Sequence, residues 1–220
     1  MARMARVVIP GVPHHVVQRG NRRMDVFFGD DDYRTYLRLV STFARKSDTA
    51  IWAYCLMPNH VHLILVPSHA DGLRGTLAEA HRIYAREINR REEWQGHLWQ
   101  ERFYSYPMSD DHLLHAARYI ELNPVTAKMV RSPTEWPWSS ARAHLVGSDD
   151  GIVTTRPLLE RVGDWQAILA ERMDPDAREM LEKHLQTGRP VGDTDFVERL
   201  EALTGRRLRP AKRGRKSSRV

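Results

Sequence analysis

The chain has 220 residues, of which 41% are hydrophobic and 28% charged, and its formal net charge is +6. This length suits one domain with a small appendage, and the apolar fraction is sufficient for a packed core. No stretch approaches the roughly 20 apolar residues of a membrane helix. The basic first six residues precede only three apolar ones before Pro10, too few for a signal peptide, so we expect a cytoplasmic protein without membrane contact.

The single cysteine, Cys55, excludes an internal disulfide and a cysteine-based zinc site. It lies in an apolar run, so we expect a buried, inert thiol.

The basic residues are concentrated at the two ends of the chain. Residues 1–23 hold five arginines and residues 206–220 hold eight lysines or arginines, with no acid in either segment. The body, 24–205, has 21 basic and 28 acidic residues and a net charge of −7. A basic tail on an acidic body favours a polyanionic partner such as nucleic acid. The alternative is a solvated tail that binds nothing.

Hydrophobic periodicity predicts six elements in the first half of the chain. They are a strand at 14–20, a helix that begins near Asp30–Asp32, a strand at 50–56, a strand at 60–66, a helix from 72 to about 90 and a strand at 98–107. The second and third strands are joined by a tight turn at 57–59 and should form a hairpin. A further helix from Ser109 or Asp110 to Leu122 should stop at Asn123-Pro124.

This order, β-α-β-β-α-β and then a helix, is typical of the α+β, ferredoxin-like split β-α-β fold. We expect a four-stranded antiparallel sheet with helices on one face, and an added helix over part of the other. Residues 1–147 would form this domain. Helices at 155–161, 164–173, 175–187 and 193–204 would form a helical extension over 148–205, with Gly205 as a C-cap. Residues 206–220 are too polar to fold alone, which predicts a disordered basic tail.

His60 and His62 alternate with Val61 in the third predicted strand. Residues i and i+2 of a strand face the same side, so both imidazoles should leave one face of the sheet. Two neutral imidazoles can hold a divalent ion between them. A pair of exposed or hydrogen-bonded histidines is the simpler alternative, since the chain has 11 histidines. His14-His15 illustrates a chance pair, because adjacent strand residues cannot share a face.

Tyr119 lies on the same stripe of its predicted helix as His115 and Asn123, because the three are four residues apart. Apolar residues of that helix take the core-facing stripe, which leaves the phenol free to face the histidines. A tyrosine can serve as a covalent nucleophile. Its ordinary pKa of about 10 makes it a poor one, so a cation on the target phosphate would help. In isolation, a helical tyrosine is more often a core or interface residue.

Four motifs resemble those of one known family. They are residues 57–62 (MPNHVH), 96–103 (GHLWQERF), 119–125 (YIELNPV) and 136–140 (WPWSS). The first contains the His-hydrophobic-His motif of the HUH endonucleases, and the four together resemble the REP-associated tyrosine transposases, which are single-tyrosine transposases. The resemblance covers roughly residues 10–147, and 205–215 also resembles the basic end of family members.

The resemblance implies a role for each matching residue. His60 and His62 would bind Mg²⁺ or Mn²⁺, with Asn123 completing the metal shell. Tyr119 would attack the scissile phosphate of single-stranded DNA, keep a 5′-phosphotyrosine bond and release a 3′-hydroxyl. The substrate would be a REP palindrome, a DNA hairpin preceded by a specific tetranucleotide. The resemblance also implies a nucleoid-associated protein that is a monomer rather than a dimer. The catalytic positions show no departure from the family pattern.

DNA binding needs phosphate contacts, and aromatic side chains can stack on bases. The basic candidates are Arg19, Arg22, Arg23, Arg82, Arg86, Arg206, Arg207, Arg209, Lys212 and Arg213. Arg82 and Arg86 could equally belong to a solvated helix face. The tail should add affinity that is independent of DNA sequence. Four large aromatic residues are expected in the core rather than on a stacking platform: Trp99, Phe103, Trp136 and Trp138.

Two alternatives remain at this point. Histidine-triad nucleotide hydrolases carry His-x-His-x-His on a strand, but position 64 is isoleucine, so that arrangement is incomplete. The second is a domesticated protein that binds hairpin DNA without cutting it. The intact His60, His62 and Tyr119 argue against this reading, and a covalent protein–DNA adduct would distinguish the two.

Overall fold

The computed structural model describes residues 5–171 and 175–210, with only the backbone described at 175–178 and 182. The elements that form the sheet and its layers are β1 (His14–Arg19), α1 (Asp30–Lys46), β2 (Thr49–Met57), β3 (His60–Pro67), α2 (Gly72–Arg91), β4 (Tyr104–Pro107) and α3 (Asp110–Glu121). They are followed by α4 (Asn123–Thr126), α5 (Ala141–Val146), α6 (Arg156–Leu159), α7 (Trp165–Ala170), α8 (Pro175–Thr187) and α9 (Thr194–Thr204). None of the helices in the described ranges is long and apolar enough to span a bilayer.

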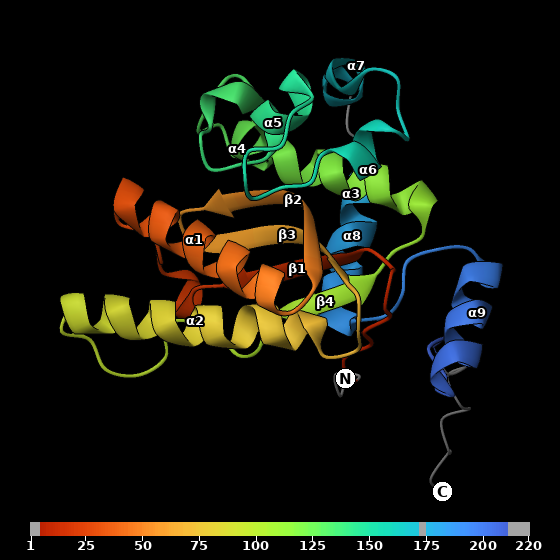
Figure 1. The fold of residues 1–220 in the computed structure, drawn as a ribbon, viewed down its shortest axis with the longest axis horizontal. Helices are drawn as coiled ribbons and strands as arrows, with labels where there is room; N and C mark the ends of the chain where they lie inside the picture. The colour runs from red at the N-terminus through yellow and green to blue at the C-terminus, as the bar shows by residue number, and fades with distance from the viewer. Residues whose placement is uncertain (1–4, 172–174, 211–220) are drawn as a thin grey trace, which may run out of the picture.

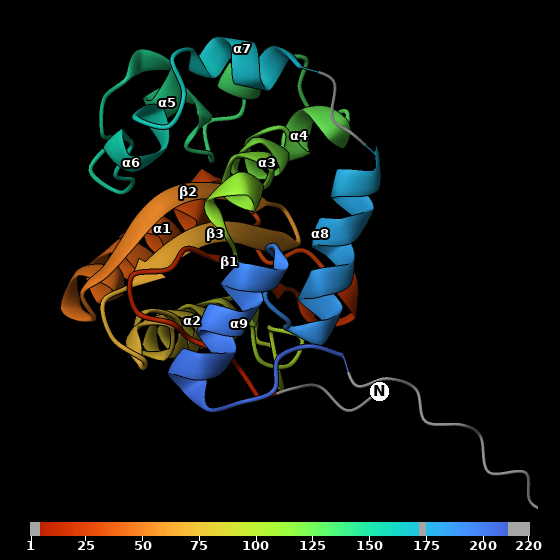
Figure 2. The ribbon, with the colours of Figure 1, turned by 90° about the vertical axis from the view of Figure 1, so that its right-hand side faces the viewer.

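The four strands form one antiparallel sheet in the order β2-β3-β1-β4, which confirms the predicted α+β fold (Figure 1). Helices α1 and α2 lie side by side over one face, and α3 lies over the other (Figures 1 and 2). The strands alternate between these layers. Val61 and Leu63 belong to the core under α1 and α2, whereas His62 faces the layer of α3. The period of two along β3 therefore separates an apolar face from a face that carries histidines.

Strand β4 is shorter than the predicted 98–107. Residues 98–100 run beside the end of β1, where Gln100 N donates to Arg19 O (2.8 Å) and Gly20 bridges to Trp99. Glu101 then takes a φ of +54°, a left-handed conformation that interrupts an extended strand. The ladder resumes only at Tyr104.

The dipeptide Asn123-Pro124 ends α3 as predicted, but a second short helix, α4, begins at Asn123 itself. Proline is tolerated in the first turn of a helix, where its missing N–H has no partner to lose. Helix α5 was not predicted.

Residues 136–140 cover the edge of β2. Leu56 N donates to Trp138 O (2.8 Å), Ser140 N donates to Tyr54 O (3.0 Å), and the Trp136 indole donates to Leu56 O (2.9 Å). An unpaired edge strand invites association with other chains, and this segment occupies its hydrogen-bonding groups. The core placement of the aromatic residues is confirmed for Trp99, Phe103 and Trp138, which are buried, and Trp136 is half-buried.

Glu121, at the end of α3, is a fully buried carboxylate with three partners. Its Oε1 accepts from Ser140 Oγ (2.6 Å) and lies 2.6 Å from His144 Nδ1, and its Oε2 accepts from the Trp165 indole (2.9 Å). These contacts join α3 to the segment that covers β2, to α5 and to α7. A buried carboxylate is tolerated only when it is paired in this way.

The C-terminal region packs onto the first domain. Helix α8 packs against β4 and α3, and Leu208 is buried with Phe196 and Leu200 of α9 and with Val7 and Ile9. Residues 206–210, part of the predicted disordered tail, are therefore held in place, because Leu208 is apolar enough to join a core. Residues 211–220 lie outside the described residues. Cys55 is buried, as predicted, and burial raises the pKa of its thiol.

We expect Glu121→Ala to lower the free energy of unfolding by about 3 kcal/mol, because it leaves buried polar partners without an acceptor. Urea unfolding measures this loss. The control is Glu160→Ala, which removes an exposed carboxylate paired with Arg156 and should change stability by less than about 0.5 kcal/mol. Equal stability of the two variants would show that the Glu121 cluster does not hold α3 in place.

Candidate active site

Strand pairing places the two motif histidines in neighbouring rows on one face of the sheet. His60 is paired with Arg19 of β1, and His62 with Val17 of β1 and Cys55 of β2. Directly paired residues of an antiparallel sheet point to the same side. The predicted common face of the two imidazoles is confirmed, and their ring centroids lie 4.9 Å apart.

His60 is oriented by the turn that precedes it. Its Nδ1 lies 2.6 Å from Asn59 Oδ1. A carboxamide oxygen can only accept, so Nδ1 carries the proton and Nε2 keeps its lone pair. Asn59 in turn donates from Nδ2 to Arg23 O (3.1 Å), which ties the loop after β1 to this histidine.

His62 lies between two polar partners. Its Nδ1 is 3.0 Å from His15 Nε2, and its Nε2 is 3.4 Å from the side-chain nitrogen of Asn123. The interpretation of His14-His15 as a chance pair is wrong for His15, which points into the site. His14 is on the opposite face, where its Nε2 accepts from Ile9 N (3.2 Å). His14 and His15 point to opposite faces of the sheet, as adjacent strand residues must. The pairing register of β1 with β3 decides which of the two lies next to His62.

Tyr119 of α3 lies against this row of histidines. Its ring centroid is 5.4 Å from that of His62 and 6.1 Å from that of His15, in edge-to-face geometry, and the residue is 8% exposed. Tyr119 and Asn123 of the predicted stripe face the histidines, whereas His115, the third member, is exposed at the surface.

A cavity of about 580 Å³ opens over Tyr119 and His62. Its other lining residues are Val17, Arg19, Arg23, Gln100, Tyr104, Leu185 and Gln186. Leu185 and Gln186 belong to α8, so the helical extension supplies a wall of the site. Sequence analysis missed these two residues, because nothing in a polar amphipathic helix shows which groove it will close.

Burial keeps the site histidines neutral. It lowers the pKa of His60 to about 4, with a smaller effect from Arg19, and that of His15 to about 3. The pKa of His62 also falls well below 6.5, first through burial and then through its histidine and arginine neighbours. Neutral imidazoles are the form that binds metal ions.

The donor set fits a divalent cation. The His60 and His62 rings lie next to each other with centroids 4.9 Å apart, and the Asn123 side-chain nitrogen lies 3.4 Å from His62 Nε2, so rotation of that amide would present its oxygen to the same imidazole. In the described part of the chain, no three His, Cys, Asp or Glu side chains are placed to hold a metal together. A cation here would therefore take two imidazoles and an amide from the protein, and oxygen ligands from water or phosphate for the rest.

The loop after β1 sends two arginines to different cavities. Arg23 lines the cavity over Tyr119, and Arg22 lines a second cavity of about 630 Å³. Both residues have a positive backbone φ, +52° at Arg22 and +63° at Arg23. Gly20 starts this turn because a Cβ there would lie 2.2 Å from Met24 O. Residues with left-handed backbone are concentrated at functional sites, where the backbone conformation fixes the direction of the side chain.

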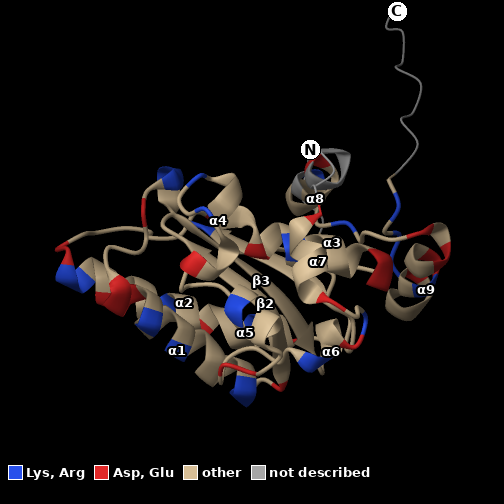
Figure 3. Ribbon diagram, turned by 90° about the horizontal axis from the view of Figure 1, so that it is seen from above, with Lys and Arg blue, Asp and Glu red and all other residues tan. Residues whose placement is uncertain are grey.

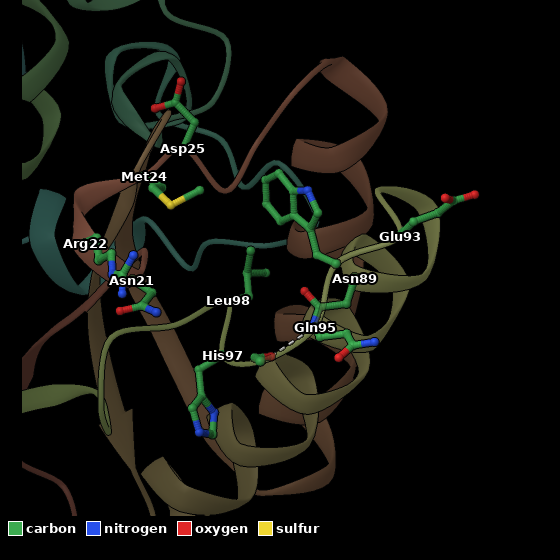
Figure 4. A pocket seen from close by; sticks show the side chains of 11 residues that line it. Asn21, Arg22, Met24, Asp25, Asn89, Glu93, Gln95, His97 and Leu98 are labelled. Atoms are coloured by element: carbon green, nitrogen blue, oxygen red, sulfur yellow. Dashed lines mark hydrogen bonds between the residues drawn. The ribbon is translucent and has the colours of Figure 1, made fainter.

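The second cavity is lined by a mixture of amide, charged, aromatic and aliphatic side chains. Figure 4 shows Asn21 and Arg22 on one side and Asn89 and Gln95 on the other, with Leu98 between them.

The other predicted DNA-binding residues that the structure describes lie away from Tyr119. Arg82 and Arg86 are on α2, over the opposite face of the sheet, and Arg82 pairs with Glu79 (2.6 Å). Acidic and basic residues are interspersed along α1 and α2 (Figure 3). Arg206 donates to the backbone oxygens of Ala5 and Arg6, and Arg209 pairs with Glu198 and Glu201. Arg207 is exposed, and Lys212 and Arg213 lie outside the described residues.

Comparison with known proteins gives two results. Residues 10–123 match the protein family described as "Transposase IS200 like", and no curated protein sequence matches the chain.

The similar solved structures include two that are described as transposases. One is described as "Structure of the REP associates tyrosine transposase bound to a REP hairpin", with 21% identity, a TM-score of 0.54, and coverage of 70% of this chain and 92% of that one. The other is a candidate transposase from Deinococcus radiodurans R1, with 21% identity, a TM-score of 0.37, and coverage of 55% and 96%. The first supports the fold, and the second score is too low to support an argument.

We expect the protein to lose stability as pH falls from 6.5 to about 3, the folded-state pKa of His15 and His81. Histidines whose folded pKa is depressed bind fewer protons than they do in the unfolded chain, so unfolding is favoured as pH falls through this window. His81, on the buried face of α2, has a pKa lowered to about 3 by burial and should account for about 2 kcal/mol of the loss at pH 5. Chemical denaturation at pH 7.5 and 5 should show a smaller pH effect for His81→Gln than for the wild type. The control, His69→Gln at an exposed position, should behave as wild type; a wild-type response from His81→Gln would contradict the assignment.

Proposed function

The chain belongs to the family of IS200-like transposases, and from this premise we propose that it cuts and rejoins single-stranded DNA with Tyr119 as the nucleophile. The observation that supports this most directly is the position of Tyr119. Its ring lies against His62 at the floor of a cavity that is also lined by Arg19 and Arg23. A phenol, a neutral imidazole and two guanidinium groups line one cavity, and this combination supports the proposal.

The proposed substrate is hairpin DNA of the REP type, preceded by a specific tetranucleotide. The similar solved structure is of a transposase bound to a REP hairpin. The cavity here suits a single strand, because it is open, contains two arginines and is walled by α8 on one side. We propose a monomer as the active form, as the resemblance to REP-associated tyrosine transposases implies.

In the proposed reaction, the Tyr119 hydroxyl oxygen attacks the scissile phosphorus. The bond from phosphorus to the 3′ oxygen breaks, and that oxygen leaves as a 3′-hydroxyl after it gains a proton. The phenol proton passes to solvent in the open cavity. The product is a 5′-phosphotyrosine, and attack by a 3′-hydroxyl on it rejoins the strand without an energy source.

The groups around Tyr119 have separate proposed roles. Arg19 and Arg23 would hold the flanking phosphates and align the scissile one. His60, His62 and Asn123 would hold Mg²⁺ or Mn²⁺, which neutralises charge on the phosphate oxygens as the bond is attacked. Gln100 and Gln186, at the rim, would contact the strand by hydrogen bonds.

We expect Tyr119→Phe to abolish formation of the covalent adduct and to leave hairpin affinity within a few-fold, because only the attacking oxygen is lost. The assay mixes protein, Mn²⁺ and a 3′-labelled hairpin oligonucleotide and looks for label that migrates with the denatured protein. The control is Tyr104→Phe, which removes another phenol from the same cavity and should preserve the adduct. An adduct that persists in Tyr119→Phe would transfer the role to another residue. Binding without an adduct in the wild type would indicate a hairpin-binding protein that does not cut.

Two arginine variants test which face binds DNA. We expect Arg23→Gln to weaken hairpin binding and to reduce the salt dependence of the binding constant by roughly 0.7 to 1 in the log–log slope, the value of one lost phosphate contact. Arg86→Gln, on the opposite face, should leave both quantities unchanged. Fluorescence anisotropy over a salt series measures both quantities. A larger loss of affinity in Arg86→Gln than in Arg23→Gln would place the DNA-binding surface on α2 instead.

A further inference from the structure

Behind His62 lies a chain of buried hydrogen bonds that the proposed reaction does not use. We propose that His15 and Tyr106 are positioning residues that hold His62 in the tautomer whose Nε2 can bind the cation. This inference rests on the proposed function, because it concerns the cation site assigned there. It adds two residues that belong to none of the four sequence motifs.

Three strands contribute one member each. His62 Nδ1 of β3 lies 3.0 Å from His15 Nε2 of β1, and His15 Nδ1 lies 2.8 Å from the hydroxyl of Tyr106 in β4. The two imidazoles are stacked at 5.2 Å with an interplanar angle of 28°, and Tyr106 meets His15 edge-on at 5.3 Å. Across the sheet, from the edge strand β4 through β1 to β3, the order is Tyr106, His15 and His62, and the proposed cation would bind beyond His62.

Because these three side chains are buried from water, each depends on the others for its hydrogen bonds. Tyr106 and His15 are 0% exposed and His62 is 2% exposed. A fully buried imidazole with no carboxylate partner is held neutral, with one N–H, because burial disfavours its charged form. A neutral imidazole donates from one nitrogen and accepts at the other, so the state of one ring dictates the state of the next.

The chain therefore has two self-consistent states. In the first, Tyr106 donates to His15 Nδ1, His15 donates from Nε2 to His62 Nδ1, and the proton of His62 is on Nε2, which blocks a cation. In the second, His62 donates from Nδ1 to His15 Nε2, and His15 donates from Nδ1 to the Tyr106 oxygen. Only the second leaves the His62 Nε2 lone pair free. Asn123, whose side-chain nitrogen lies 3.4 Å from that atom, can donate to the same lone pair in the unloaded state.

Removal of the Tyr106 oxygen acts against the second state. His15 Nδ1–H would then be a buried donor without an acceptor, which costs more than an unused lone pair. Partners of this kind behind metal-binding histidines typically account for a 10- to 100-fold difference in metal affinity.

The chain contains a matched control. On the other side of the sheet, the Tyr36 hydroxyl lies 2.9 Å from His81 Nε2, and both residues are buried. This pair has the same chemistry and burial but no link to His62. Tyr36→Phe therefore reports the general cost of removing a buried tyrosine hydroxyl.

The experiment is calorimetric titration of the full chain with Mn²⁺, without DNA. We expect Tyr106→Phe to weaken Mn²⁺ binding by about 10-fold or more, and Tyr36→Phe to change it by less than 2-fold. His15→Leu should weaken binding at least as much as Tyr106→Phe. His15→Gln should recover part of the loss, because its side-chain oxygen can accept from His62 Nδ1. Thermal unfolding of each variant checks that it is folded.

Nitrogen NMR of the wild type, loaded with diamagnetic Mg²⁺, tests the same point without substitution. The expected result is a proton on His62 Nδ1, and a proton on Nε2 would overturn the inference. Equal Mn²⁺ affinity in wild type and Tyr106→Phe, with weaker binding in His62→Ala, would overturn it and leave the proposed function intact. Equal affinity in wild type and His62→Ala would remove the cation site itself and overturn both.

Discussion

The pairing register of β1 between β3 and β4 is the constraint on which the candidate site depends. It aligns Arg19 with His60, Val17 with His62 and Tyr104, and His15 with Tyr106. All these residues then point to the face covered by α3. A slip of one residue would turn β1 over and send Arg19 and His15 into the apolar core under α1 and α2. The site is thus a property of three strands, of which the histidine motif is one part.

The position of Tyr119, the proposed nucleophile, is fixed by a buried polar cluster at the end of α3. Tyr119 is two residues before Glu121, whose carboxylate binds Ser140, His144 and Trp165. Ser140 belongs to the segment that covers the edge of β2, so α3 is linked to the sheet through the strand next to β3. Buried polar clusters of this kind favour one arrangement over others of similar packing. The aromatic-serine motif near the cluster therefore has a structural explanation that needs no contact with DNA.

The region around the site combines rigid and adaptable parts. The histidines lie on strands and Tyr119 on a helix, which suits groups that must be held in place for chemistry. The arginines that would contact DNA lie at the end of β1 and in a loop with left-handed backbone at Arg22 and Arg23. Asn59 connects the two, since it accepts from His60 and donates to Arg23 O. If a DNA strand contacts that loop, the hydrogen bonds of Asn59 connect the contact to His60, a predicted cation ligand.

Local periodicity in the sequence was sufficient for much of this protein. The period of two placed His60 and His62 on one face, and the helical period placed Tyr119 and Asn123 on one stripe, because both rules act over a few residues of one element. The order of elements indicated the α+β sheet for the same reason. Only the tertiary structure could identify His15 and Tyr106 as neighbours of His62, Leu185 and Gln186 as a wall of the site, and Glu121 as the anchor of α3. Register, the docking of α8 and the pairing of a buried carboxylate are contacts between residues distant in sequence, and no local pattern encodes which distant partner a side chain will meet.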